Sequence, residues 1–146
     1  MQRVLLLRKL HTLPGCSGTI MQNLHGEPIQ LSVGDYLLWK RHITQQIISD
    51  YANVTCDRNP IHTEQAKQPI AHGMLLGSMF SAMIGTTLPG VKYLKQTLTF
   101  PKSVPANTTV MAKVTVKRVF PSKRIVVLTT KVEDERKPYV KEKPLY

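Results

Sequence analysis

AHGMLLGSMFSAMI, residues 71–84, is the stretch that decides the fold. Its large apolar residues recur at the spacing of one helix face, and small residues occupy the other face. No Asp, Glu, Lys or Arg occurs between Ala71 and Val91. A helix without a charged face is expected to be buried, and small residues would let a sheet approach it closely. The large residues are Leu75, Leu76, Met79, Phe80 and Met83, and the small ones are Gly77, Ser78, Ser81, Ala82 and Gly85.

A membrane-spanning helix is the alternative for this charge-free stretch. The stretch is long enough, but it contains several Gly, Ser and Thr residues as well as Pro89. A spanning helix is built from about 20 predominantly apolar residues. The composition therefore favours a buried helix in a globular domain, and we expect no transmembrane segment.

Strand patterns follow the central helix. Apolar and polar residues alternate over 94–100 and over 110–117, and 125–132 is rich in β-branched residues. Asn107 and Pro121-Ser122 are expected in the turns between them. Leu88-Pro89-Gly90 is expected to end the helix.

Before the central helix, residues 36–43 are typical of a strand and 45–53 of a short helix. Thr44 is expected to cap that short helix, with Ile47, Ile48 and Tyr51 facing inward. Consecutive strands pair most readily antiparallel. The sequence therefore predicts an α+β fold in which one antiparallel sheet wraps around a single apolar helix.

DRNPIH, residues 57–62, is expected to form a fixed loop between the two helices. Pro60 biases Asn59 toward extended geometry, and Asn59 can bond its own backbone in a turn. Fully extended, this loop would separate Asp57 and His62 by at most about 17 Å, and a turn brings them much closer. A carboxylate and an imidazole that share one water can activate it or move a proton.

Gly73 is expected at the N-terminus of the central helix, where backbone N–H groups are unpaired and the dipole is positive. Such an N–H can stabilise an oxyanion, and glycine lets a ligand approach closely. Ordinary structural roles remain open: Asp-x-Asn-Pro is a common turn, His62 can be a surface residue, and His72 is expected to start the helix. A metal site of Asp57, His62 and His72 has no supporting ligand spacing, so we expect no metal and no cofactor.

The chain has 146 residues, 42% of them hydrophobic and 20% charged, which is typical of a single globular domain. Its two cysteines form no disulfide framework and indicate a reducing compartment. We expect Cys56 to be a small buried residue and not a nucleophile, because nothing suggests an activating base for it.

The net charge is +11, and residues 91–146 hold 13 Lys or Arg against 4 Asp or Glu. This balance favours an acidic partner such as a carrier protein, a phosphate-bearing cofactor, anionic lipid or nucleic acid, or else a solvated face without a ligand. No basic motif interleaved with aromatic residues supports nucleic acid as the partner.

The first twenty residues carry Arg3, Arg8, Lys9 and His11 and no acid, with Val4 to Leu7 and Leu10 able to form one side of a short basic helix. This pattern predicts a mitochondrial targeting segment over 1–20 and a single domain over 21–146. A frayed basic N-terminus is the alternative. A secretory signal is disfavoured because the apolar run has only four residues before Arg8.

Taken together, the loop and the helix start resemble a known family. YANVTCDRNPIH, residues 51–62, is similar to the signature of the MaoC-like, (R)-specific enoyl-thioester hydratases, and PIAHGML, residues 69–75, is similar to the opening of their central helix. Residues 88–90 and 98–101 match later landmarks, and the resemblance runs from about Val33 to Val132. With its N-terminal segment, the chain is most similar to the mitochondrial 3-hydroxyacyl-thioester dehydratases of type 2.

The resemblance implies a hot-dog fold, usually dimeric, that interconverts (R)-3-hydroxyacyl and trans-2-enoyl thioesters by loss or gain of water. It implies that Asp57 and His62 hold the water and shuttle the proton at C2, without fixing which is the acid. Asn59 would fix the loop, and the Gly73 N–H would receive the thioester oxygen. The substrate would be carried on acyl carrier protein or coenzyme A in the mitochondrial matrix. The alternatives are a catalytically impaired thioester-binding or scaffolding hot-dog protein and, less in keeping with the Asp57–His62 motif, a thioesterase.

Three departures from the family pattern bear on activity. Cys56 replaces the usual glycine before the catalytic acid, which restricts the loop if that position needs a positive φ. Between His62 and His72 the chain is several residues shorter than usual, which affects how Gly73 sits relative to Asp57. Lys137-Pro138 and Lys143-Pro144 interrupt the expected last strand and would leave an open sheet edge.

Overall fold

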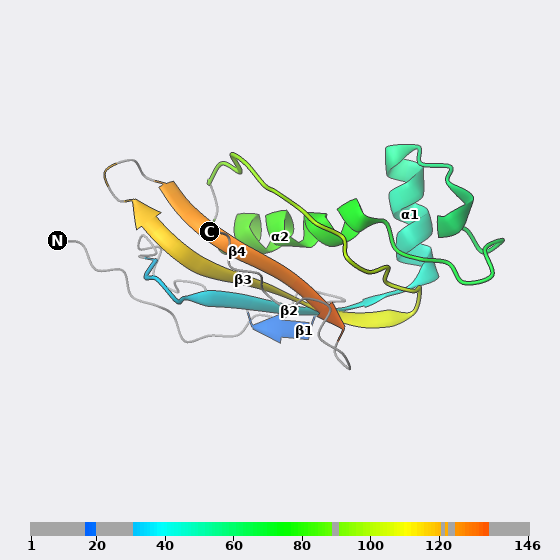
Figure 1. Ribbon diagram of the computed structural model, residues 1–146, viewed down its shortest axis with the longest axis horizontal. Helices are drawn as coiled ribbons and strands as arrows, with labels where there is room; N and C mark the ends of the chain where they lie inside the picture. The colour runs from blue at the N-terminus through cyan, green and yellow to red at the C-terminus, as the bar shows by residue number, and fades with distance from the viewer. Residues whose placement is uncertain (1–16, 20–30, 89–90, 121, 123–124, 135–146) are drawn as a thin grey trace.

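The computed structural model describes residues 17–19, 31–88, 91–120, 122 and 125–134. Its elements lie in the order β1 (Ser17–Thr19), β2 (Tyr36–Ile43), α1 (Gln45–Thr55), the 3₁₀-helix η1 (Pro60–His62), α2 (Gly73–Thr87), β3 (Thr108–Phe120) and β4 (Ile125–Asp134). The strands form one antiparallel sheet in the order β1-β2-β3-β4. Helix α2 lies along one face of this sheet, while α1 and η1 stand at one end of it (Figure 1). The predicted α+β arrangement of a sheet around one helix is confirmed.

The centre of the sheet is β3, which pairs with β2 on one side and with β4 on the other. Its alternate residues Val110, Ala112, Val114 and Val116 are all buried. The alternation over 110–117 therefore predicted the inward face correctly. Asn107 takes φ 60° directly before the strand, as expected for a turn residue that tolerates the left-handed region.

Helix α1 is anchored by its cap and by one buried residue. The Thr44 side chain accepts a hydrogen bond from the Ile47 backbone N–H at 3.2 Å, as predicted for an N-cap. Ile48 is fully buried, and Ile47 and Tyr51 pack against the core. The helix runs for eleven residues from this cap and ends at the beginning of the polar loop.

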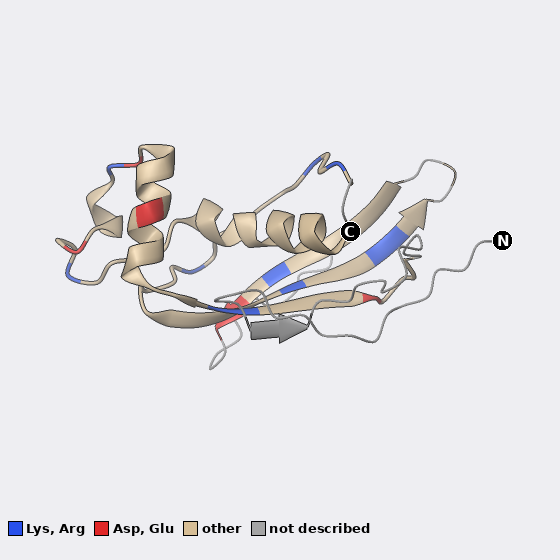
Figure 2. Cartoon of the chain, turned by 180° about the vertical axis from the view of Figure 1, so that it is seen from behind, with Lys and Arg blue, Asp and Glu red and all other residues tan. Residues whose placement is uncertain are grey.

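Helix α2 is only partly covered, so the expectation of burial on every side is wrong. Its large residues are the buried ones, and Met83 is fully buried, whereas the close approach of the sheet was expected on the small-residue side. The sheet reaches one side alone, and part of the small-residue side is exposed, together with Met74 at 57%. No charged residue lies on α2 (Figure 2). The exposed small residues are Ser78, Ser81, Ala82 and Gly85.

The predicted strand over 94–100 is wrong in the described structure. Residues 91–100 run as an extended segment beside α2 without a hydrogen-bonded strand neighbour among the described residues. Gln96 and Leu98 are half-buried, whereas Leu94 is 74% exposed. The alternation marks two faces of this segment, but a strand also requires a neighbour that supplies backbone hydrogen bonds.

Several expectations fall wholly or partly outside the described residues. The residues outside the described ranges include Pro89-Gly90, Pro121, the prolines after β4 and most of the expected targeting segment. Strand β1 was not expected. It lies within the first twenty residues and pairs with β2. Within the described part of the chain, no helix is both long and apolar enough to cross a membrane.

Candidate active site

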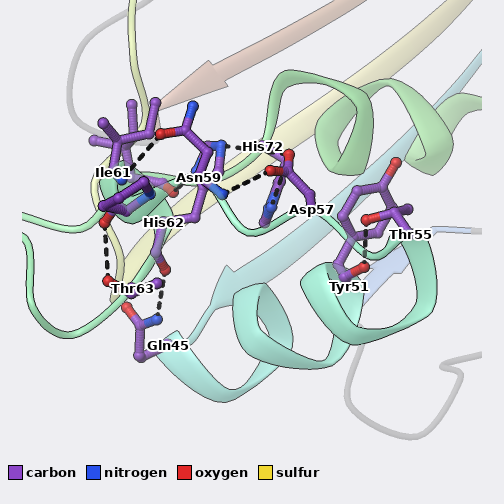
Figure 3. A network of polar contacts seen from close by, with 11 residues as sticks. Gln45, Tyr51, Thr55, Asp57, Asn59, Ile61, His62, Thr63 and His72 are labelled. Carbon is purple, nitrogen blue, oxygen red and sulfur yellow. Dashed lines mark hydrogen bonds and ion pairs between the residues drawn. The ribbon is translucent and has the colours of Figure 1, made fainter.

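The end of α1 places Asp57. Cys56 takes the left-handed conformation at φ 57° and ψ 25°, and the Asp57 backbone N–H donates to the Ala52 carbonyl at 3.0 Å. A left-handed residue with this bonding ends many helices. The Asp57 carboxylate then turns back, and its Oδ1 accepts from the Asn59 N–H at 2.9 Å. The other oxygen, Oδ2, is left facing the two nearby imidazoles (Figure 3).

Cys56 differs from expectation in one respect and agrees with it in another. Its side chain is exposed, so the expectation of a buried cysteine is wrong. Its φ is positive, which is the conformation that glycine adopts without strain. A cysteine at this position therefore stores backbone strain directly before Asp57.

Asn59 and Pro60 begin η1 and thereby place His62. The Asn59 side chain accepts from the Ile61 N–H at 3.3 Å, and Pro60 occupies the first turn, where its missing N–H costs nothing. Gln45 of α1 donates to the His62 carbonyl at 2.9 Å. The expected fixed loop is thus tied at its start by Asn59 and at its end by α1.

One hydrogen bond defines the chemistry of His62. Its buried ring places Nδ1 2.7 Å from the Ile70 carbonyl oxygen. A carbonyl oxygen only accepts, so Nδ1 carries the proton and neutral His62 presents a lone pair on Nε2. Nε2 lies 3.9 Å from Asp57 Oδ2. The structure thus brings together the two residues that the sequence selected as an acid–base pair.

His72 is the site residue that the sequence analysis missed. As expected, it starts α2, but its ring also stacks on His62 with centroids 3.6 Å apart and planes at 25°. Its Nε2 lies 3.6 Å from Asp57 Oδ2, closer than His62 does. The available signal was its place directly before Gly73, which puts it at the same helix start.

Burial governs the charge of His72. The residue is 4% exposed. Desolvation lowers the pKa of His72 below its ordinary value of 6.5, and the neighbouring His62 lowers it further, while Asp57 acts in the opposite direction. A neutral imidazole therefore lies beside the acid–base pair at neutral pH.

Gly73 directly follows His72 and is the first residue of α2, so its N–H has no acceptor within the helix. The Phe100 ring lies against it, and a Cβ at this position would be 2.9 Å from two ring carbons. The short segment between His62 and His72 closes back, because the Ile70 N–H donates to the Ile61 carbonyl at 3.0 Å. The shortening therefore leaves the helix start next to the Asp57 cluster.

A cavity of about 130 Å³ lies beside the same helix. It lies between α2, residues 97–102 and β4. Gly77 reaches it one helical turn, about 6 Å, beyond Gly73, and Phe100 lines both places. The apolar lining includes Leu76, Phe80, Leu98, Phe100, Val104 and Val132.

Asp57, His62 and His72 form a group that could hold a metal, with one ligand atom from each within 4.8 Å of the others. Two imidazoles that bind one tetrahedral ion must point their lone pairs at the same position from different directions. Here the rings stack nearly parallel, so their lone pairs run side by side. This arrangement suits a water or a proton better than an ion. One water could donate a hydrogen to Asp57 and to His62, about 2.8 Å from each.

A hot-dog domain with a carboxylate–imidazole pair at the start of its central helix has the fold and the groups of an acid–base enzyme. The chain belongs to the MaoC-like domain family, whose model matches residues 37–137. This confirms the family that residues 51–62 and 69–75 indicated. It also confirms the expected enzyme class, a hydro-lyase.

Particular relatives agree with this assignment. The 3-hydroxybutyryl-CoA dehydratase of Methylorubrum extorquens is 37% identical over 116 residues, which cover 72% of this chain and 74% of that protein. A mitochondrial 3-hydroxyacyl-[acyl-carrier-protein] dehydratase of Arabidopsis thaliana is 39% identical over 77 residues, which cover 48% of this chain and 46% of that protein.

A solved structure confirms the hot-dog fold. The (R)-hydratase from Aeromonas caviae involved in PHA biosynthesis superimposes with a TM-score of 0.70 at 30% identity. The match covers 75% of this chain and 89% of that chain.

Replacing Cys56 with glycine is expected to stabilise the fold. Left-handed backbone costs a non-glycine residue about 1–2 kcal/mol, and the greater freedom of glycine in the unfolded chain offsets part of this. We expect the free energy of unfolding of Cys56→Gly to rise by roughly 0.5–1 kcal/mol in urea titrations. Asn107→Gly is the matched control at φ 60° and should gain less, because asparagine tolerates this region. An equal gain at both positions would show that Cys56 is not specifically strained.

Stability is expected to fall on mild acidification because of His72. As pH drops through about 6.5, the unfolded chain takes up a proton on this residue that the folded chain does not, and the free energy of unfolding decreases. Urea titrations between pH 7.5 and 5.5 should show this slope, and His72→Phe should reduce it. His42→Gln, which changes an exposed histidine that bonds Thr109, should leave it unchanged. A wild-type slope retained in His72→Phe would assign it to another group.

Proposed function

We propose that the chain is an (R)-3-hydroxyacyl-thioester dehydratase and trans-2-enoyl-thioester hydratase of mitochondrial fatty-acid synthesis. The observation that carries the proposal is the 3.9 Å approach of Asp57 Oδ2 to His62 Nε2, beside the free N–H of Gly73. A second support is the M. extorquens relative, whose name gives it the dehydration of a 3-hydroxyacyl thioester.

In the hydration direction, the reaction adds the water oxygen to C3 and a proton to C2 of the enoyl thioester. The Gly73 N–H receives the thioester oxygen, on which negative charge builds up as the water adds. Asp57 and His62 hold the water between them, and the proton that one of them takes from the water is delivered to C2, directly or after it passes between the two. Protons taken and given balance over the cycle. Dehydration reverses the same steps.

The cavity beside α2 would hold the acyl chain. Its volume of about 130 Å³ compares with a share of about 30 Å³ for one water in the liquid, so it suits a short chain. Phe100 lies between the thioester position at Gly73 and the cavity, where its ring would guide the chain inward.

Carrier and compartment follow from charge and from a relative. A basic surface with a net charge of +11 favours an acidic acyl carrier protein or the phosphates of coenzyme A. The A. thaliana relative is a mitochondrial dehydratase of carrier-linked substrates. Together with the acid-free basic segment over 1–20, this supports the mitochondrial matrix as the location.

A homodimer would cover the surfaces that the described chain leaves open. Leu94 is 74% exposed, Val91 49% and Tyr93 42%, all on an extended segment without a strand neighbour in the described part. An unpaired edge of this kind is a template for another strand. The uncharged outer side of α2 lies beside it (Figures 1 and 2). A second copy of the chain, paired edge to edge along 91–100, would bury both.

A thioester-binding protein with impaired catalysis is the second candidate. It is favoured by the short 62–72 segment and by the exposure of the site, since the Asp57 side chain is 39% exposed and Ile61 is 46% exposed. Water exclusion strengthens electrostatic catalysis, and this site excludes water incompletely.

Asp57→Asn and His62→Gln are each expected to lower the rate of crotonyl-coenzyme A hydration by about 10²–10⁴-fold, because each removes a proton-transferring group. The measurement is the loss of enoyl-thioester absorbance, with circular dichroism to establish that each variant is folded. Asp50→Asn, an exposed acid on α1 that bonds Gln46, is the matched control and should retain activity. Full activity in both site variants would reject the proposed mechanism. Binding without turnover in wild type, with carrier-linked substrate also tested, would favour the second candidate.

Gly73→Ala is expected to lower hydration activity without unfolding the protein. Its methyl group would lie 2.9 Å from two carbons of the Phe100 ring and push that ring from the helix start, which would disturb the proposed thioester site. Phe100 is 53% exposed and can move, so the stability cost should be small. The same assay measures activity, and Gly85→Ala in the same helix has open space and should gain about 1 kcal/mol of stability with activity retained. Normal kinetics in Gly73→Ala would remove this glycine from the site.

Leu94→Lys is expected to dissociate the proposed homodimer, because it places a charge at the centre of the paired edge. Light scattering coupled to gel filtration would report the mass of wild type and variant at the same concentration. Val33→Lys is the control. Val33 is also an apolar residue, 68% exposed on a turn, and this change should leave the dimer intact. A monomeric wild type, or a dimer that Leu94→Lys does not weaken, would contradict this interface.

A further inference from the structure

His72 is a buried side chain whose polar atoms are left without partners. The residue is 4% exposed, and neither Nδ1 nor Nε2 makes a hydrogen bond to another residue that the structure describes. A buried donor or acceptor without a partner destabilises the folded state, and native structures contain few of them. The helix start does not explain it, because His72 makes no capping bond with its side chain.

Packing holds this ring in one orientation. His62 stacks on one side with centroids 3.6 Å apart, and the Tyr51 ring of α1 lies at 5.0 Å with planes at 53°. The orientation directs Nε2 toward Asp57 Oδ2 at 3.6 Å (Figure 3). Asp57 is partly exposed, so a small rotation of its carboxylate closes this distance to that of a hydrogen bond.

Hydrogen-bond chemistry assigns the proton. Asp57 Oδ2 is an acceptor when ionised, and neutral His62 presents only a lone pair at Nε2 because its proton is on Nδ1. Of the three groups that meet here, neutral His72 is the one able to donate to the carboxylate. It does so only as the tautomer that carries its proton on Nε2.

We propose that His72 is a positioning residue: it donates its Nε2–H to Asp57, which aims the carboxylate at the reacting water. His62 is then left as the imidazole that exchanges protons with water or substrate. The catalytic part of this role rests on the proposed hydratase function. The tautomer and its bond to Asp57 do not.

The surroundings keep His72 neutral for this role. The groups that face it are Asp57 from the loop, His62 from η1 and the Tyr51 ring from α1. Burial and His62 both lower the pKa of His72, and the positive N-terminal end of α2 acts in the same direction. Arg58 next to Asp57 directs its guanidinium to the Asn53 side chain at 3.5 Å.

Nitrogen-15 NMR of the histidine rings tests the bond without any turnover. At pH 7.5, wild type should show His72 as neutral imidazole with the proton on Nε2, and Asp57→Asn should shift the His72 ring resonances while His42 stays unchanged. A charged His72, or one protonated on Nδ1 alone, would overturn the proposal. This result stands whether or not the protein proves to be a hydratase.

Kinetics of two variants then test the positioning role. His72→Phe keeps a stacked ring without a donor, and His72→Gln keeps an N–H donor. Hydrogen bonds to charged groups are strong enough that losing one should lower kcat about 10- to 100-fold in His72→Phe. Asp57 without its donor should also hold its proton more tightly, so the acid limb of the pH–kcat profile should move to higher pH, and His72→Gln should restore both effects in part.

Two outcomes would overturn the role. If His72→Phe and His72→Gln lose activity equally with an unmoved acid limb, His72 contributes packing alone. If folded His72→Phe keeps the wild-type kcat and profile, it contributes nothing to the reaction. Inactive wild type would count against the hydratase function and not against the assigned tautomer, which the NMR measurement decides.

Discussion

The packing of α2 against the sheet is the constraint on which the site depends. Met79 and Met83 press against the inward faces of β2 and β3, where Ile43 and Val110 are fully buried. This contact fixes the helix axis and therefore the position of its first residue, Gly73. Only a short segment connects η1 to Gly73. The start of α2 therefore lies close to η1 and to the end of α1. The acid–base pair lies where they meet.

The sequence predicted those parts of the fold that depend on one neighbour. Period-two alternation identified β3, and the apolar face of 71–84 identified α2, because each pattern reflects burial against the single sheet or helix that this chain supplies. The sequence prediction failed where the described chain supplies no element to pack against or pair with. The alternation over 94–100 is real, but no described strand pairs with it, and the small-residue side of α2 is charge-free yet uncovered. Both failures lie side by side, which is what a shared missing surface would produce.

Within the site, local chemistry was predictable and contacts between elements were not. Asn59 and Pro60 specify their own turn, so the approach of Asp57 to His62 followed from six consecutive residues. His72 reaches the cluster only through the joint placement of α1, η1 and α2, and no spacing encodes the stacking of its ring on His62. The conformation of Cys56 was not predictable from local sequence either. Its left-handed φ arises because α1 ends there.

Strain and unsatisfied groups gather around Asp57. Cys56 is held at a positive φ, and neither nitrogen of the buried His72 ring makes a hydrogen bond among the described residues. Each feature costs stability, and the rest of the fold has to supply it. A loop with only a structural role would be more stable with glycine in place of Cys56 and an apolar ring in place of His72. Their concentration beside one carboxylate is the pattern of a site in which partners are provided by substrate and water, and it argues that the arrangement serves chemistry more than folding.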